Sequence, residues 1–308
     1  MSFWKKHGVT FILVIIFIIG LCLLAYPTFS DYWNSFHQSR AIASYAEEVA
    51  NMDDDEYERM LSAAEEYNKK LSQTGIRWHM SDEEKEEYDS VLNVSGTGIM
   101  GYIEIDKIKC SLPIYHGTGD SILQIAIGHI EGTSLPVGGQ GTHCVLSGHR
   151  GLPSARLFTD LDQMEKGDTF VIRTLDEMLT YEVDQILIVE PDDLSSLTID
   201  PKKDYVTLVT CTPYGINTHR LLVRGHRIQN LKNVKNIRVS ADANQIEPIM
   251  VAPFTTIPIL LMLLIILIVT THDNNKRKKE RENKKNYTEN RKKRRLSLKK
   301  SDKKGDEV

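Results

Sequence analysis

The sequence predicts a mainly β domain that follows a helical segment and is flanked by two transmembrane helices. Two long apolar runs, residues 9–25 and 249–271, lie on either side of a polar stretch. Within that stretch, helical spacing of apolar residues gives way near residue 96 to short strand-like runs separated by Gly, Pro and Asp. We therefore expect a cytoplasmic N-terminus with the first anchor (1–30), an extracellular helical lead-in (31–95), a β domain (96–230), a linker (231–248), a second transmembrane helix (249–271) and a basic cytoplasmic tail (272–308).

The charges of this chain are unevenly distributed. The 308 residues carry a formal net charge of −4 and are 41% hydrophobic, which excludes a disordered or collagen-like chain. Residues 271–308 hold 16 Lys and Arg against 7 Asp and Glu, a charge of +9, so the remaining residues carry −13. A basic segment beside an apolar run is typical of a stop-transfer sequence that contacts anionic lipids, and we do not expect nucleic acid as a partner.

The first apolar run predicts an uncleaved membrane anchor. Lys5 and Lys6 precede it and favour a cytoplasmic N-terminus. A cleaved signal peptide is the alternative, but the residues after the run, Tyr26-Pro-Thr28, offer no clear small-x-small cleavage site. The bases that begin at Lys276 place the other end of the chain in the cytoplasm as well. The expected location is the cell membrane, with two spans and residues 31–248 outside.

The lead-in predicts amphipathic helices. Apolar residues recur at helical spacing in two groups, which are Ile42, Tyr45, Val49, Met52 and Met60, Ala64, Tyr67, Leu71. Ser81 with Glu84 forms a capping-box pattern that starts a further helix at Asp82. The loop 72–80 between these helices contains Trp78.

The β domain is predicted from short runs with strand-like composition. They are residues 101–106, 142–147, 169–173, 179–183, 185–189, 205–210 and 220–224. Short strands at close spacing indicate an all-β barrel or sandwich. The three cysteines of the exposed part, Cys110, Cys144 and Cys211, are odd in number, so at least one is free or pairs with another chain.

Cys211 is the candidate nucleophile. It ends the apolar run that starts at Tyr205, and a strand end holds a side chain rigidly while the next loop can leave it accessible. The alternative is a buried structural cysteine, which is common.

Arg220 begins the next strand-like run, after a turn-rich connection. If the two runs pair as a hairpin, Cys211 and Arg220 lie side by side, and the guanidinium can favour a thiolate or stabilise an oxyanion. Arg224 and Arg227 are competing choices, and a plain surface arginine is the alternative.

A thiol nucleophile also needs a histidine. The β region and its edges offer six, which are His116, His129, His143, His149, His219 and His226. His149 follows a buried-type strand in Ser147-Gly-His-Arg-Gly151, where glycines let the backbone bring the ring close to another group. His143 falls inside that strand and is expected to pack or to bond backbone, and His219 should point away from the face of Arg220.

Other chemistries lack support in the sequence. No Cys-x-x-Cys, His-Glu-x-x-His or Gly-x-Ser-x-Gly pattern occurs, and the Gly-rich piece at 138–141 lacks the following Lys-Ser/Thr of a phosphate loop. We therefore expect neither a metal site nor a nucleotide site.

These residues resemble the sortase family. Thr207-Leu-Val-Thr-Cys211 is similar to the family's Thr-Leu-x-Thr-Cys signature, Arg220 fits its arginine, and Ser147-Gly-His-Arg-Gly151 fits its histidine loop. The stretches 132–139 and 211–220, the helical lead-in and the C-terminal span resemble the pilus-type class C branch. The resemblance covers residues 96–227.

The resemblance implies a closed eight-stranded β-barrel and a cysteine transpeptidase on the surface of a Gram-positive cell. Cys211 would attack the Thr–Gly bond of an LPxTG-like sorting signal, His149 would act as general acid and base, and Arg220 would stabilise the thiolate or oxyanion. In class C a pilin lysine resolves the acyl-enzyme, and no cofactor is implied. The alternatives are a sortase that anchors surface proteins to peptidoglycan and a non-catalytic receptor that only binds peptides.

One feature of the class C pattern is missing. Class C sortases carry a lid with an Asp-Pro-aromatic motif over the cysteine, and residues 31–96 contain no such tripeptide. Trp78 is the nearest aromatic candidate for a lid, and the alternative is that it packs on the helices.

Overall fold

The computed structural model describes residues 2–230 and short helical stretches at 258–262, 264–265, 277, 280–281, 283–284 and 287–288. Contacts divide the chain into two units, residues 1–25 with 246–308 and residues 26–245. Most of the predicted linker, second transmembrane helix and basic tail lie outside the described residues.

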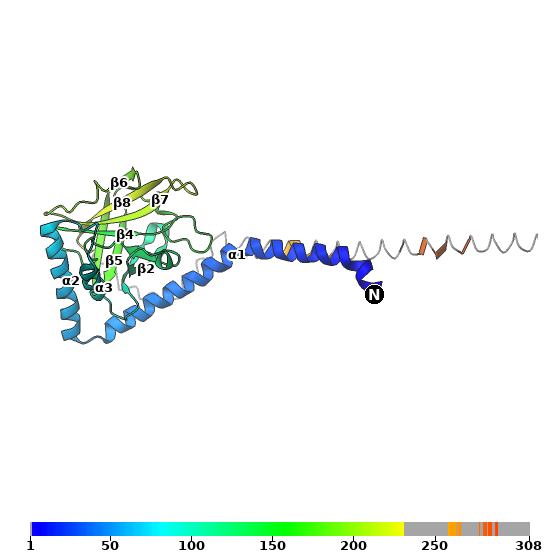
Figure 1. The fold of residues 1–308 in the computed structure, drawn as a ribbon, viewed down its shortest axis with the longest axis horizontal. Coiled ribbons are helices and arrows are strands. Elements are labelled where there is room, and N and C mark those ends of the chain that lie inside the picture. Colours follow the sequence, from blue (N-terminus) through cyan, green and yellow to red (C-terminus); the bar gives the residue numbers. More distant parts are fainter. Residues whose placement is uncertain are drawn as a thin grey trace, which may run out of the picture. The chain divides into compact units, whose positions relative to one another are not determined.

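Three helices precede the barrel in the chain, and Figure 1 labels them. They are α1 (Ser2–Asn51), α2 (Asp54–Thr74) and α3 (Asp82–Ser90). The portion of α1 from Ile12 onward is long and apolar enough to cross a membrane. Asp53 caps α2 by accepting a hydrogen bond from the Glu56 N–H at 2.7 Å. The predicted capping box of Ser81 and Glu84 is present at the start of α3.

The helices are attached to the barrel through buried polar contacts. Tyr45 of α1 is 1% exposed, and its hydroxyl donates to the Met100 carbonyl at 3.2 Å and accepts from the Leu175 N–H at 2.8 Å. Burial raises the pKa of Tyr45 well above its ordinary value, so the hydroxyl stays protonated. Asn68 of α2 bonds both the carbonyl and the N–H of Leu135.

Eight strands close the barrel, which confirms the predicted mainly β fold class. They are β1 (Ile99–Ile105), β2 (Cys110–His116), β3 (Ile127–His129), β4 (Thr142–Ser147), β5 (Thr169–Thr174), β6 (Glu177–Val189), β7 (Asp204–Thr212) and β8 (His219–Ile228). Their spatial order is β1-β2-β3-β4-β7-β8-β6-β5. The pairs β2–β3 and β4–β7 are parallel, and the others are antiparallel. A short helix, α4 (Asp120–Leu123), and two 3₁₀ turns, η1 (Asp106–Ile108) and η2 (Leu161–Gln163), lie in the connections.

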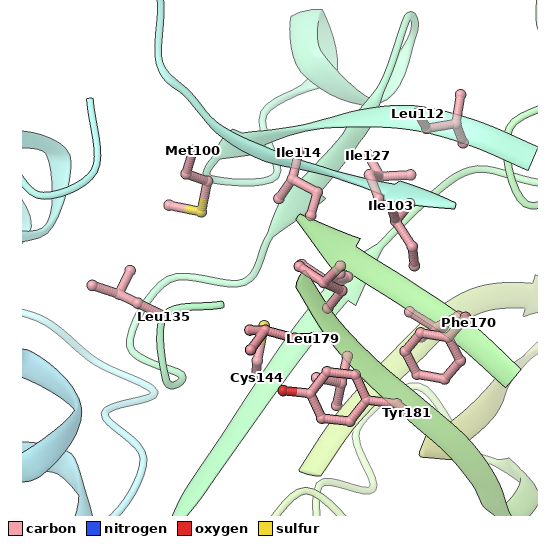
Figure 2. Packing of buried hydrophobic residues seen from close by; sticks show 14 of the residues in the cluster. Met100, Ile103, Leu112, Ile114, Ile127, Leu135, Cys144, Phe170, Leu179 and Tyr181 are labelled. Atoms are coloured by element: carbon pink, nitrogen blue, oxygen red, sulfur yellow. The ribbon is translucent and has the colours of Figure 1, made fainter. Parts of the chain in front are cut away.

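The barrel interior is filled by alternate residues of each strand. Figure 2 shows Ile114, Leu179, Tyr181 and Cys144 in the same apolar interior. Cys144 is 2% exposed, so this cysteine belongs to the core. Burial of a closed interior of this kind is the main source of stability for the domain.

The strands depart from the sequence prediction at two places. The runs 179–183 and 185–189 form one strand, β6, with an irregular register between Val183 and Gln185. The residue between them, Asp184, points a carboxylate at Arg224, with distances of 2.9 and 3.1 Å. The sequence reading also missed β2, which contains Pro113, and β3, which has only 3 residues.

Candidate active site

Cys211 lies near the end of β7 on the outer face of the barrel. Val206 and Leu208 belong to the interior, so Val209 and Cys211 point outward by the alternation of a strand. Cys211 keeps part of its surface exposed, and the loop 213–218 that follows is exposed throughout. The thiol is therefore held by a rigid strand and remains accessible.

Arg220 lies directly opposite Cys211. The predicted hairpin of β7 and β8 is present, with Cys211 paired to Arg220 and Thr212 paired to His219. Directly opposite residues share one face, so the guanidinium and the thiol emerge on the same side. The Arg220 Nη1 donates to the carbonyls of Asn217 at 3.3 Å and His219 at 3.1 Å. No carboxylate among the described residues pairs with this arginine.

The two competing arginines have acidic partners of their own. Arg224 pairs with Asp184 at 2.9 Å and stacks over the Tyr205 ring, 4.1 Å from its centroid. Arg227 lies 4.0 Å from Asp204. Both lie farther along β8 from the cysteine, so of the three arginines only Arg220 is placed beside the thiol.

The backbone places His149 at the same level as Cys211. Strands β4 and β7 are parallel, with Ser147 beside Val209. His149 lies two residues after Ser147, and Cys211 lies two residues after Val209. The pairing extends past the strand end, because the Gly148 N–H donates to the Val209 carbonyl at 3.0 Å and Thr210 donates to the Gly148 carbonyl at 2.8 Å. His149 is partly exposed, on the outward side by strand alternation.

Glycine at position 148 is required by this packing. A Cβ there would lie 2.7 Å from the Phe158 ring and 2.9 Å from Ile127. The His149 carbonyl also accepts a hydrogen bond from the Phe158 N–H at 3.1 Å. The close approach of Phe158 thus fixes the turn from which His149 projects.

The other histidines are engaged elsewhere. His143 is fully buried and bonds the Thr198 carbonyl and the Thr207 hydroxyl, as the sequence indicated. His129 is also buried, with Tyr88 at one nitrogen and the Ser134 carbonyl at the other. Burial lowers the pKa of each to about 4, so both are neutral at pH 7.

The remaining three histidines also differ from His149. His116 bonds two backbone carbonyls, and His226 lies six residues beyond Arg220 on β8. His219 contacts Glu190 at 3.2 Å and is paired with Thr212 rather than with the cysteine.

Arg150 joins the histidine loop to the cysteine loop, a role that sequence reasoning missed. Its side chain is only 9% exposed, forms an ion pair with Asp162 and donates to the Thr212 hydroxyl at 3.4 Å. The guanidinium also lies 5.8 Å from the centroid of Tyr214, whose ring packs on Gly151. A charged residue beside His149 was visible in the sequence, but its partners come from distant segments.

A buried apolar cluster lies on the same outer side of the sheet as the thiol. Val145, Leu197, Val209 and Leu222 form a separate cluster, which we call the outer cluster. Val209 and Leu222 are each two residues from Cys211 and Arg220 along their strands, so the outer cluster continues directly from the thiol. All four side chains are buried, so the outer cluster packs the strands beside the thiol firmly together.

The other two cysteines of the barrel differ from Cys211. Burial raises the pKa of Cys144 well above its ordinary value and raises that of Cys110 to about 12, although part of Cys110 is exposed. All of these thiols are free. Only the thiolate is an effective nucleophile, so Cys144 and Cys110 are poorly suited to catalysis.

Trp78 is 36% exposed in the loop between α2 and α3. The loop is attached to the barrel through the Arg77 N–H, which donates to the Gly132 carbonyl at 3.0 Å. Gly132 belongs to the connection between β3 and β4. This connection runs beside Val145 in the middle of β4, and not beside Ser147, where β4 ends. The structure thus shows where the loop is attached, and the lid role of Trp78 stays a prediction.

A half-exposed cysteine at a strand end, an arginine opposite it and a histidine at the adjacent strand end define a β-barrel of the cysteine-nucleophile class. Comparisons with known proteins agree with this class. The family model described as Sortase domain matches residues 103–228. The crystal structure of sortase C1 from Streptococcus agalactiae is 55% identical, with a TM-score of 0.61, and the match covers 62% of this chain and 100% of that one.

Two further relatives extend the comparison. The Streptococcus pneumoniae sortase C structure is 45% identical, with a TM-score of 0.56, over 62% of this chain and 97% of that one. Sortase D of Bacillus subtilis is 33% identical over 131 residues, which are 42% of this chain and 63% of that protein. The chain thus spans less than two thirds of the length of this curated relative. The chain belongs to the sortase family, a family of cysteine transpeptidases.

Proposed function

We propose that this chain is a membrane-anchored sortase of the pilus-assembly type. It cleaves an LPxTG-like sorting signal between Thr and Gly and joins the acyl group to a lysine amine of a pilin. The observation that carries the proposal is the pairing of Cys211 with Arg220 on the outer face, beside the end of β4 that bears His149. The Streptococcus pneumoniae relative was described in connection with pilin substrate specificity, which supports the choice of substrate.

The first half of the reaction forms a thioester. The Cys211 thiolate attacks the threonine carbonyl carbon, and the carbonyl oxygen becomes an oxyanion. The C–N bond then breaks while His149 donates its proton to the leaving glycine amine. Arg220 serves the oxyanion, because its Nε and Nη2 have no partner among the described residues while Nη1 is held by the loop.

The second half transfers the acyl group. A neutral lysine amine attacks the thioester carbon, His149 accepts the proton from that amine, and the C–S bond breaks to restore the Cys211 thiolate. The product is an isopeptide bond. Proton donation and then acceptance by one histidine closes the cycle without any other group.

The outer cluster supports the placement of the reacting groups. Val209 and Leu222 are 8% and 4% exposed, and they lie two residues from Cys211 and Arg220 along their strands. Because both side chains are packed, the strand ends that carry the thiol and the guanidinium are held rigidly.

The membrane arrangement belongs to the proposal as well. The apolar part of α1 is proposed to anchor the chain, and the bases before the first apolar run and after the second support cytoplasmic termini. The barrel, residues 96–230, and its helical lead-in, residues 31–95, are then extracellular. In this position the enzyme meets exported proteins that are still attached to the bilayer by their sorting signals.

The direct test is Cys211→Ala in the bacterium that encodes the chain, with Cys110→Ala as the matched control. Covalent high-mass pilin ladders should disappear in the first variant and persist in the second. Ladders that persist without Cys211, in a strain with no other sortase, would show that pilin polymerisation is wrong. Accumulation of cell-wall-linked monomers in the wild type alone would instead favour a peptidoglycan amine as acceptor.

A further inference from the structure

The part of α1 that follows the apolar run carries an exposed row of aromatic side chains. Tyr26, Phe29, Trp33 and Phe36 are 57%, 73%, 60% and 55% exposed. Their spacing of three, four and three residues puts them on one face of the helix, and we call this set the aromatic stripe. Four large aromatic rings left in water would be a costly surface for a helix that has nothing to bind.

The opposite face of this helix is already occupied by the barrel. Asp31 accepts from the Arg156 N–H at 2.9 Å, Asn34 donates to the Ser154 carbonyl at 2.8 Å, and Gln38 donates to the Ile125 carbonyl at 2.6 Å. The buried Ile42 and Tyr45 continue the same face. These contacts fix the rotation of the helix, so the aromatic stripe points away from the barrel.

The position of the aromatic stripe along the chain indicates its partner. The stretch without charged residues runs from Gly8 to Ser30 and has 23 residues, whereas about 20 are enough to cross a hydrocarbon core, so the aromatic stripe lies at the outer end of the span. From Tyr26 to Phe36 the helix rises about 15 Å, which exceeds the headgroup layer of about 7 Å on one side, so a tilt is needed to immerse all four rings.

The residue types also match a bilayer surface. Tyrosine and tryptophan concentrate in the headgroup layer, where the ring is shielded and the polar atom meets water. On the same face the next residue after Phe36 is the exposed Arg40, which suits anionic lipid phosphates. Glu47 then follows on this face, and an acidic residue there marks the end of the surface.

We propose that the aromatic stripe lies in the headgroup layer of the outer leaflet and binds anionic lipid, with Arg40 at its distal edge. The inference rests on the proposed anchoring of α1, and not on the transpeptidase reaction. Binding of the aromatic stripe to the bilayer keeps the contacts of α1 with Ser154 and Arg156 close to the membrane surface. Ser154 and Arg156 lie in the loop that starts at His149. The reacting groups then stay within reach of a sorting signal that is still attached to the membrane.

The fluorescence of Trp33 tests this placement. The chain has three tryptophans, so Trp4→Phe with Trp78→Phe leaves Trp33 alone in the full-length protein, reconstituted into phosphatidylglycerol-containing vesicles. We expect blue-shifted emission, strong quenching by lipids brominated near the glycerol, and weak quenching by iodide. The matched control is Trp4→Phe with Trp33→Phe, because Trp78 in the α2–α3 loop should be quenched by iodide and not by the brominated lipid.

Three results would overturn the proposal. Quenching of Trp33 by iodide and not by lipid would place the aromatic stripe in water. Blue-shifted emission that neither reagent quenches would show a protein contact, such as a second copy of the chain. Loss of the lipid quenching on deletion of residues 249–308 would show that the partner is the second apolar run.

A functional comparison separates this proposal from the proposed reaction. The triple variant Phe29→Ser, Trp33→Ser, Phe36→Ser should cleave a soluble LPxTG peptide at the wild-type rate. It should cleave the same peptide tethered to vesicle lipid about tenfold more slowly, since the effective concentration of substrate at the site falls. Equal rates on the tethered peptide contradict the proposal. Absence of all cleavage by the wild type would contradict the reaction instead, while the fluorescence result would still decide the stripe.

Discussion

The inner and outer faces of the adjacent strands β4 and β7 carry two cysteines in opposite circumstances. Cys144 of β4 points into the barrel beside Leu146 and is 2% exposed, while Cys211 of β7 points outward near a strand end. Burial raises the pKa of Cys144 well above its ordinary value, whereas Cys211 has a guanidinium as its cross-strand neighbour. One sheet therefore buries one thiol and leaves the other accessible, through strand alternation and the point at which the strand ends, and the proposed reaction uses the accessible thiol.

The largest expected effect separates the two cysteines. Cys211→Ala should lower kcat for transpeptidation by at least about 10⁴-fold, because no other group can form the thioester. Cys144→Ala should keep kcat within a few-fold and lower the free energy of unfolding by about 1 kcal/mol, because it leaves a small cavity in the core. Steady-state rates with a sorting-signal peptide and chemical denaturation of both variants measure these effects. Loss of kcat in well-folded Cys144→Ala would contradict the claim that Cys144 has only a structural role.

The second effect concerns the arginines of β8. Arg220→Ala should lower kcat by about 10²–10³-fold, the usual effect of removing an oxyanion donor. Arg220→Lys should recover part of that loss, since the charge remains and the planar fork does not. Arg224→Ala is the matched control and should leave kcat nearly unchanged, because its partner is Asp184 rather than the thiol. Equal losses in both alanine variants would mean that Arg220 acts only through the fold.

The third effect concerns a buried histidine, His129. Burial lowers the pKa of His129 to about 4 in the folded protein, against about 6.5 when unfolded. The unfolded state therefore binds more protons between these values, so the stability from this group is complete above pH 6.5 and is lost as pH falls to about 4. The loss amounts to about 3 kcal/mol by linkage. Thermal unfolding of the chain in detergent should show this fall in stability with falling pH, and His129→Gln should reduce it. An unchanged pH dependence in folded His129→Gln would contradict the assignment.

The smallest effect concerns access to the outer thiol. If Trp78 covers Cys211, Trp78→Ala should speed labelling of Cys211 by a small thiol reagent several-fold, and Cys144 should stay unlabelled in both proteins. Labelling followed by peptide mapping measures each site separately. An unchanged rate at Cys211 would remove Trp78 as a lid and leave the α2–α3 loop as a structural attachment through Arg77 and Gly132.

The sequence predicted part of this site from local patterns. A strand ending at Cys211, a turn and a second strand starting at Arg220 form a hairpin, and hairpin pairing follows from chain continuity. The level of His149 depends instead on the parallel pairing of β4 with β7, whose paired residues are 62 apart in the chain. No local periodicity reports such a pairing, so the sequence pattern favoured His149 among six histidines without showing its place beside Cys211.

The missed elements have similar causes. Pro113 and the short length of β3 hide two strands from composition, although the closed barrel needs both. The position of Arg150 between Asp162 and Tyr214 depends on three separate segments, so the sequence could give only the arginine itself. The helical lead-in was the most predictable region, because the repeat of buried residues and the Ser81 capping box are local features.

The most direct test of the account is the identity of the acylated residue. The full-length protein is mixed with an LPxTG peptide without an amine acceptor, quenched in acid and digested for mass spectrometry. The account predicts a single thioester adduct on Cys211 that retains the peptide up to its threonine, is absent in Cys211→Ala, and disappears when a lysine amine is added. An adduct on Cys110 or Cys144, or cleavage with no covalent adduct in wild type and His149→Ala alike, would contradict it.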